Sequence, residues 1–195
     1  MHRAAESSIL CILRMDWEPR KLTAVAVDAR RAVEAERKAI GALEREGECS
    51  SWVGLSPSDR MRIVRDCRSI PTVGLYFLID DGDAPEEKND FARDALADVA
   101  EQFLSGLPGS ENCAMVLSDS ASVLHSQATK NPWTGSSGIR VLDDTSFPGL
   151  RELTRLSSLA CGETLTEIGG PPDEDLLDIY DTYTVGALGP PDSPA

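Results

Sequence analysis

The chain has 195 residues, of which 41% are hydrophobic and 27% are charged. This composition suits one folded domain and excludes wholesale disorder. The formal net charge of -14 argues against binding to nucleic-acid backbones.

The charge is unevenly distributed along the chain. Residues 1–70 carry 13 Lys and Arg against 11 Asp and Glu, a net charge of +2, whereas residues 71–195 carry 6 against 22, a net charge of -16. An acidic surface of this size attracts basic partners and divalent cations. The alternative is that the acidic residues only keep the protein soluble.

The cysteines indicate a reducing compartment. There are five, an odd number, and none forms a CxxC pair. Such cysteines are typical of reduced thiols in a cytoplasmic protein. The short apolar patch 9–13 is too brief for a signal peptide or a membrane span, so we expect a cytoplasmic protein without a membrane segment.

The first half of the chain is expected to be mainly helical after one strand. The apolar run 8–13 predicts that strand, and residues 20–46 predict a helix ended by Gly47. The helical spacing in 20–46 rests on Leu22, Val25, Ala29, Val33, Ile40 and Leu43. Ser56 and Pro57 are typical of a helix start and predict a second helix over 56–68.

The middle of the chain predicts a strand–helix–strand unit. Residues 72–79 form a continuous apolar run, as in a strand buried on both faces. An amphipathic helix is expected over 84–105 and another strand over 113–117. This order favours two parallel, neighbouring strands joined by a right-handed crossover.

The remaining segments complete the predicted fold. We expect a strand over 139–142, a helix over 150–160 and an acidic helix over 173–183. The sequence therefore predicts an α/β fold with a mostly parallel sheet of about four strands flanked by helices. It predicts one domain over 1–185, in which residues 14–70 form a mainly helical N-terminal part, and a flexible Pro- and Gly-rich tail over 186–195.

Aspartates follow the predicted strands and suggest a metal site. Asp80 and Asp81 come directly after the strand 72–79, and Asp119 follows the strand 113–117. Neighbouring parallel strands end at the same edge of a sheet, so these carboxylates could hold Mg²⁺ and activate water. The alternative is that they serve as ordinary turn or helix-capping residues.

His125 is a further catalytic candidate, because it is the one histidine away from the N-terminus. With Asp119 it could activate one of three nearby serines, although no GxSxG motif is present. Those serines are Ser118, Ser120 and Ser122. Cys113 and Cys161 are weaker nucleophile candidates because apolar surroundings raise a thiol pKa.

Two further features have no assigned role. Arg62, Arg65 and Arg68 are three residues apart and could grip a phosphate or a carboxylate, form a solvated face or pair with the protein's own acidic half. We place them opposite Met61 and the buried side of their helix. Trp133 lies in the Gly- and Ser-rich stretch 131–138, which predicts a loop.

These observations favour an acidic binding or regulatory protein, inhibitor-like or immunity-like, that recognises a basic protein or peptide. No cofactor is required by this hypothesis. The alternative is a Mg²⁺-dependent phosphoester hydrolase or transferase that uses Asp80, Asp81 and Asp119. The sequence leaves open whether the protein is an enzyme and which oligomer it forms.

Overall fold

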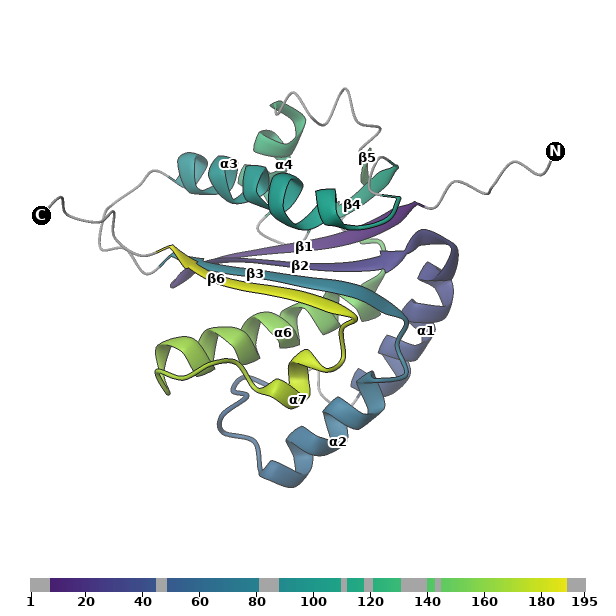
Figure 1. Cartoon of the computed structure of the whole chain (residues 1–195), viewed down its shortest axis with the longest axis vertical. Coiled ribbons are helices and arrows are strands. Elements are labelled where there is room, and N and C mark those ends of the chain that lie inside the picture. Colours follow the sequence, from purple (N-terminus) through teal and green to yellow (C-terminus); the bar gives the residue numbers. More distant parts are fainter. Residues whose placement is uncertain are drawn as a thin grey trace, which may run out of the picture.

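The computed structural model describes residues 8–44, 49–80, 88–109, 112–117, 121–130, 140–142 and 145–188. Six strands form one sheet (Figure 1). The strands are β1 (Ile9–Trp17), β2 (Arg20–Asp28), β3 (Thr72–Asp80), β4 (Cys113–Leu117), β5 (Arg140–Leu142) and β6 (Thr182–Leu188). The helices are α1 (Ala32–Leu43), α2 (Pro57–Cys67), α3 (Lys88–Asp98), α4 (Ala121–Lys130), α6 (Pro148–Thr166) and α7 (Glu174–Leu177).

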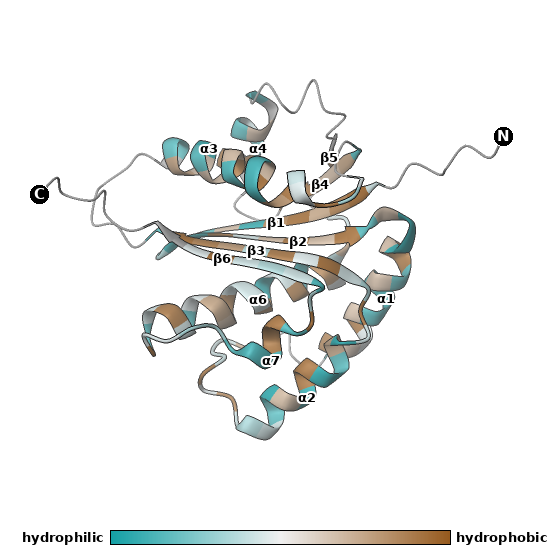
Figure 2. Cartoon of the chain, in the orientation of Figure 1, coloured by the Kyte–Doolittle hydropathy of each residue, from teal (hydrophilic) through white to brown (hydrophobic). Residues whose placement is uncertain are grey.

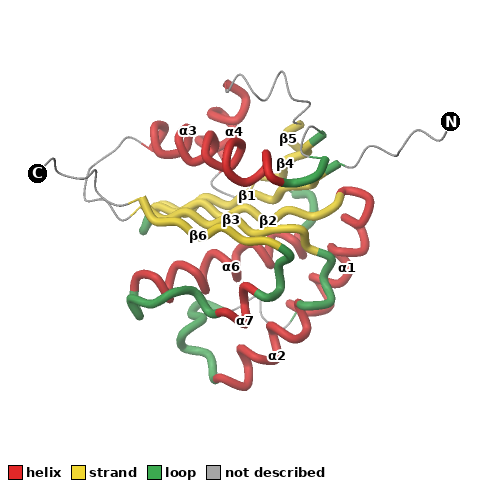
Figure 3. The backbone as a smooth tube through the Cα atoms, viewed as in Figure 1, coloured by secondary structure: helices red, strands yellow, loops and turns green. Residues whose placement is uncertain are grey.

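The sheet is mixed, in the order β5-β4-β1-β2-β3-β6 (Figure 3). β2 is antiparallel to both of its neighbours, β1 and β3. The other pairs, β1 with β4, β4 with β5 and β3 with β6, are parallel. The α/β class is confirmed, but the prediction of a mostly parallel sheet of about four strands is wrong.

The N-terminal part differs most from the prediction. The chain begins with a β1–β2 hairpin, and α1 starts only after a short 3-10 turn, Ala29–Arg31. The predicted helix over 20–46 is therefore wrong in its first third. The run Leu22–Val27 is buried on both faces of the sheet, which explains why its apolar residues fit a helical spacing as well as a strand.

The predicted strand–helix–strand unit is confirmed in its elements and wrong in its pairing. β3 is buried as expected, and β4 runs in the same direction. However, β1 and β2 lie between β3 and β4, and β4 is hydrogen-bonded to β1. The hairpin offers two long apolar edges: β3 adds to β2 on one side and β4 adds to β1 on the other. β5 then extends the sheet beyond β4, and β6 extends it beyond β3.

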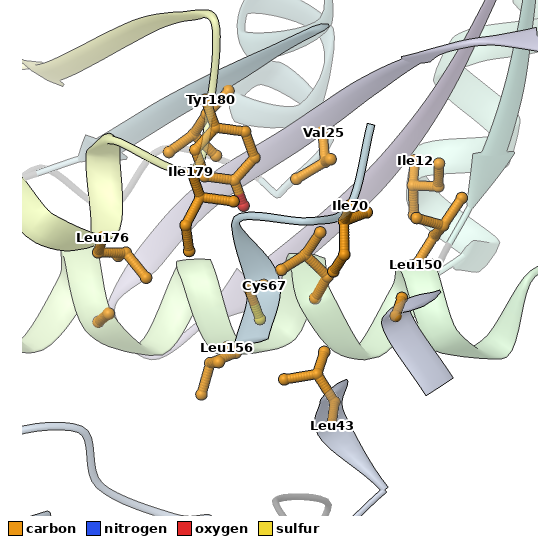
Figure 4. Close-up of a cluster of buried hydrophobic side chains, with 14 of the residues drawn as sticks. Ile12, Val25, Leu43, Cys67, Ile70, Leu150, Leu156, Leu176, Ile179 and Tyr180 are labelled. Carbon is orange, nitrogen blue, oxygen red and sulfur yellow. The ribbon is translucent and has the colours of Figure 1, made fainter. Parts of the chain in front are cut away.

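Helices cover both faces of the sheet and enclose two cores (Figure 1). α3 and α4 pack on one face, and α1, α2, α6 and α7 pack on the other. Figure 4 shows part of the core on the side of α1, α2, α6 and α7, where side chains from α2, α6 and the α7 region meet those of β1 and β2. Apolar side chains alternate between the two cores along β3: Leu75 and Phe77 face α6, whereas Tyr76 and Leu78 face α3.

The end of the chain also differs from the sequence-based expectation. The acidic helix expected over 173–183 is only the four residues of α7, and β6 begins at Thr182. β6 includes Gly186–Leu188, which the sequence assigned to the tail, and the rest of the tail lies outside the described residues. No helix in the described part of the chain has the length and apolar character needed to cross a membrane.

Candidate functional site

Asp80, the first of the predicted metal ligands, is held in an ion pair. It ends β3, and its Oδ2 lies 2.7 Å from Nη2 of Arg20 at the start of β2. The two side chains are only 9% and 16% exposed. The Arg20 guanidinium also lies 5.8 Å from the centre of the Phe91 ring on α3. Asp80 thus fastens the hairpin to the end of β3.

The other two carboxylates of the predicted metal site, Asp81 and Asp119, lie outside the described residues. These carboxylates were expected to meet Asp80 because β3 and β4 were predicted to be neighbours. β1 and β2 separate these strands, which places their axes about 14 Å apart at ordinary strand spacing. In the described ranges no group of three or more His, Cys, Asp or Glu could hold a metal ion. The Mg²⁺ site stays a prediction.

The structure describes only some of the other candidate site residues. His125 is exposed on α4, while Ser118, Asp119 and Ser120 lie outside the described residues, so the predicted triad is untested. Cys113 and Cys161 are buried free thiols. Burial raises the pKa of each to about 12, which keeps both protonated and unreactive near neutral pH. Trp133 and its loop also lie outside the described residues.

Arg62, Arg65 and Arg68, which we call the arginine row of α2, line a hollow of about 400 Å³ beside α7. Met61 is 67% exposed and lies on the same face as the arginines, so the predicted separation of these residues onto opposite faces is wrong. Helical geometry explains this, because positions 61, 65 and 68 share one face.

Each arginine of the row lies near a carboxylate of the chain itself. Arg62 is 3.6 Å from Asp59, and Arg65 is 3.2 Å from Asp66. Arg68 lies 3.5 Å from both Asp175 and Asp178. Arg68 therefore pairs with the acidic half of the chain, as one of the sequence-based alternatives held, whereas Arg62 and Arg65 pair with carboxylates of their own helix.

A second group of charges joins the β1–β2 hairpin to α6. The Asp16 carboxylate accepts hydrogen bonds from Arg14, at 2.7 and 3.1 Å, and from the Ser158 hydroxyl at 2.7 Å. Lys21 lies 3.9 Å from Asp16, and burial lowers the pKa of its ammonium group. On α6, Glu163 accepts a hydrogen bond from the backbone N–H of Val53 at 2.8 Å. These groups satisfy one another, so they fix the hairpin and a neighbouring loop to α6.

The segment around α7 carries a cluster of acidic residues on this side of the sheet. We call its five carboxylates the acidic α7 surface: Asp173, Glu174, Asp175, Asp178 and Asp181. Apolar residues alternate with them and are buried in the core that includes side chains of α2 and α6, namely Leu176, Leu177, Ile179 and Tyr180. Figure 4 labels Leu176, Ile179 and Tyr180 in this core. Figure 2 shows hydrophilic and hydrophobic residues next to one another on α7.

Several contacts hold this segment rigidly. The Asp173 side chain caps α7 by accepting a hydrogen bond from the N–H of Asp175. The Tyr180 hydroxyl is hydrogen-bonded to Ser157 on α6, and the Thr72 hydroxyl donates to the Ile179 carbonyl at 2.8 Å. The carboxylates are therefore presented on a fixed backbone.

One feature of the sequence, not interpreted above, indicates this surface. No Lys or Arg follows Arg155, so a neutralising cation for the acidic α7 surface must come from another segment. Arg68 reaches two of the carboxylates, whose side chains are still 64% and 67% exposed.

Comparison with models of protein families, with curated proteins and with solved structures finds no match to this chain.

Proposed function

We propose that this chain is a binding or regulatory protein of the cytoplasm, inhibitor-like or immunity-like, which recognises a basic protein segment through the acidic α7 surface. The observation that carries this proposal is the fixed display of five carboxylates on buried apolar anchors. A backbone that is already held in place favours binding, because little backbone freedom is lost when a partner docks.

The arrangement of charge also supports a basic partner. The chain has a net charge of -14, and Arg68 is placed to orient the acidic α7 surface without neutralising it. Complementary charge of this kind speeds the encounter of two proteins and selects against acidic competitors. The free thiols at all five cysteines agree with a reducing compartment.

The proposal is tested with two peptide probes, one rich in lysine and one rich in glutamate, at ~50 and ~500 mM salt. We expect the lysine peptide alone to bind, with an affinity that falls about tenfold at the higher salt, where the Debye length is about threefold shorter. Isothermal titration calorimetry gives the affinities.

A matched pair of variants locates the surface. The triple change D175N/D178N/D181N removes three charges from the acidic α7 surface, and D90N/D94N/D98N removes three from α3, on the opposite face of the sheet. The first variant should weaken binding about tenfold, because it removes charges from the surface where the probe binds. The second should weaken binding about twofold or less, because its charges lie far from the bound probe and are screened by solvent. Equal weakening by both variants, or no binding to the unmodified protein, would contradict the proposal.

A further inference from the structure

β6 leaves one side of the sheet open. It pairs with β3 along its whole length, from Thr182 to Leu188, and in the described part of the chain no strand pairs with its other side. Among the described residues, the backbone groups on that side have no strand partner, as at the edge of a sheet. The opposite edge of the sheet, β5, has only three residues and contains Arg140.

The sequence of β6 lacks the devices that usually block an edge strand. Natural edges are short or carry Lys, Pro or inward-pointing charges. β6 is seven residues long, with the sequence TYTVGAL, and contains no charge and no proline. Its first three residues are exposed, and Tyr183 is a 53% exposed aromatic side chain. Threonine, tyrosine and valine all favour strand pairing.

The carboxylates near β6 favour a basic strand as the one that pairs with this edge. Asp181 immediately precedes β6, and the rest of the acidic α7 surface lies just before it in the chain. A second copy of this chain would bring the same carboxylates and another net charge of -14 to the edge, so like charges would oppose that pairing. A basic strand would bring compensating charge.

We propose that an extended, basic segment of the partner adds to the outer side of β6 as a seventh strand. This inference rests on the proposed function and specifies its mode of binding. Main-chain hydrogen bonds supply affinity in strand addition, and alternate side chains supply specificity.

The register of β6 predicts which side chains the segment carries. Tyr183 and Val185 pair with Leu75 and Phe77, which face α6, so this is the face of the sheet on which α7 packs. Every second side chain of the added strand projects over that same face. Lysine or arginine at those positions meets the acidic α7 surface and can pack on the Tyr183 ring.

The test compares two versions of one peptide of about eight residues, a typical strand length, in which lysine alternates with threonine or valine. The second version is N-methylated at every peptide nitrogen, which keeps the charge but removes all backbone donors. We expect the unmodified peptide to bind at least ~10-fold more tightly, because the methylated one cannot add to a sheet. Hydrogen exchange of the β6 amides should slow only with the unmodified peptide.

The outcomes separate this inference from the proposed function. Equal affinity for the two peptides, with weakening by D175N/D178N/D181N, would overturn strand addition while supporting recognition of a basic partner. If neither peptide binds, both the strand addition and the recognition of a basic partner are overturned. Sedimentation that finds a dimer without peptide, together with β6 amides already protected from exchange, would assign the edge to a second copy and overturn the basic segment as its occupant.

Discussion

At the scale of single residues, the same aspartate can be a ligand, a cap or half of an ion pair, and its surroundings decide which. Asp80 follows an apolar strand, which made it a candidate metal ligand. In the fold Arg20 lies 2.7 Å away in a site where both side chains are mostly buried. A charge that is mostly removed from water needs an opposite charge beside it. Removing one member of the pair therefore lowers the stability of the protein, because the other charge stays buried without that compensation.

Asp80→Asn should therefore destabilise the protein by about 2 kcal/mol, because the substitution removes the carboxylate charge that pairs with Arg20 in a mostly buried site. Denaturant unfolding gives the change. Asp94→Asn is the matched control, since Asp94 pairs with Arg93 at 2.8 Å on an exposed surface, and it should cost about 0.5 kcal/mol or less. Similar costs for the two variants would contradict the role given to burial.

The cysteines allow a second test at this scale. Cys11, Cys67, Cys113 and Cys161 are buried, whereas Cys49 is partly exposed. We expect iodoacetamide at about pH 8 to modify Cys49 first, because the other thiols are shielded and burial raises the pKa of Cys11, Cys113 and Cys161. Mass spectrometry of the intact protein and its peptides reads the order. Modification of a buried thiol before Cys49 would show that its surroundings open readily.

At the scale of elements, α6 depends on a contact that the local sequence does not contain. The Glu36 carboxylate on α1 accepts hydrogen bonds from the backbone N–H groups of Gly149 and Leu150, at 2.7 and 2.9 Å. Two of the orphan donors at the start of α6 are thus capped by another helix, and a negative charge lies at the positive end of the helix dipole. The helices approach closely here because residue 149 has no side chain.

Two glycine substitutions test this approach. A Cβ atom at Gly149 would lie 2.9 Å from the Glu36 carbonyl oxygen and the Ile40 nitrogen, so Gly149→Ala should destabilise the protein by about 1–3 kcal/mol. Gly41→Ala on α1 has no atom within 4 Å of its new Cβ and should stabilise by about 0.5–1 kcal/mol, because alanine favours a helix interior. Thermal unfolding of the two variants should shift in opposite directions, and shifts in the same direction would contradict the packing described.

At the scale of the whole molecule, buried ionisable groups connect stability to pH. Burial raises the pKa of Cys113 and Cys161 to about 12 in the folded protein, from an ordinary value near 9.0. Burial also raises the pKa of Tyr76 and Tyr180. A group with a raised folded pKa contributes fully below its unfolded pKa, and its contribution is lost as the pH rises above that value, because only the unfolded chain can release the proton.

The protein should therefore lose stability in alkali, by about 1.4 kcal/mol per thiol for each pH unit above roughly 9 and up to the folded pKa. Urea unfolding between about pH 7 and 10.5 measures this slope. The variant C113A/C161A is less stable at neutral pH because it loses buried atoms, but its stability should fall less steeply above pH 9. An equal slope for both proteins would show that these thiols are not the source.

Much of the secondary structure was determined by the sequence itself. Ser56 caps α2 as expected, its side chain accepting a hydrogen bond from the N–H of Asp59, and the apolar run 72–79 forms β3. β4 and β5 lie within one residue of their predicted positions, and α6 includes the predicted helix 150–160 but extends to Thr166. These features depend on side chains near one another in the chain, such as caps, breakers and continuous apolar runs, and such interactions can be recognised without a fold.

The order of the strands and the position of the acidic α7 surface were decided only by the tertiary structure. The run Leu22–Val27 was compatible with either a helix or a strand, and its pairing with β1 and β3 decided in favour of β2. Strand order depends on which apolar faces meet across long separations, and no local pattern encodes that choice. The same reason applies to the candidate site, because the carboxylates of α7 become a fixed surface, next to an open β6, only when their apolar neighbours are buried against α2 and α6.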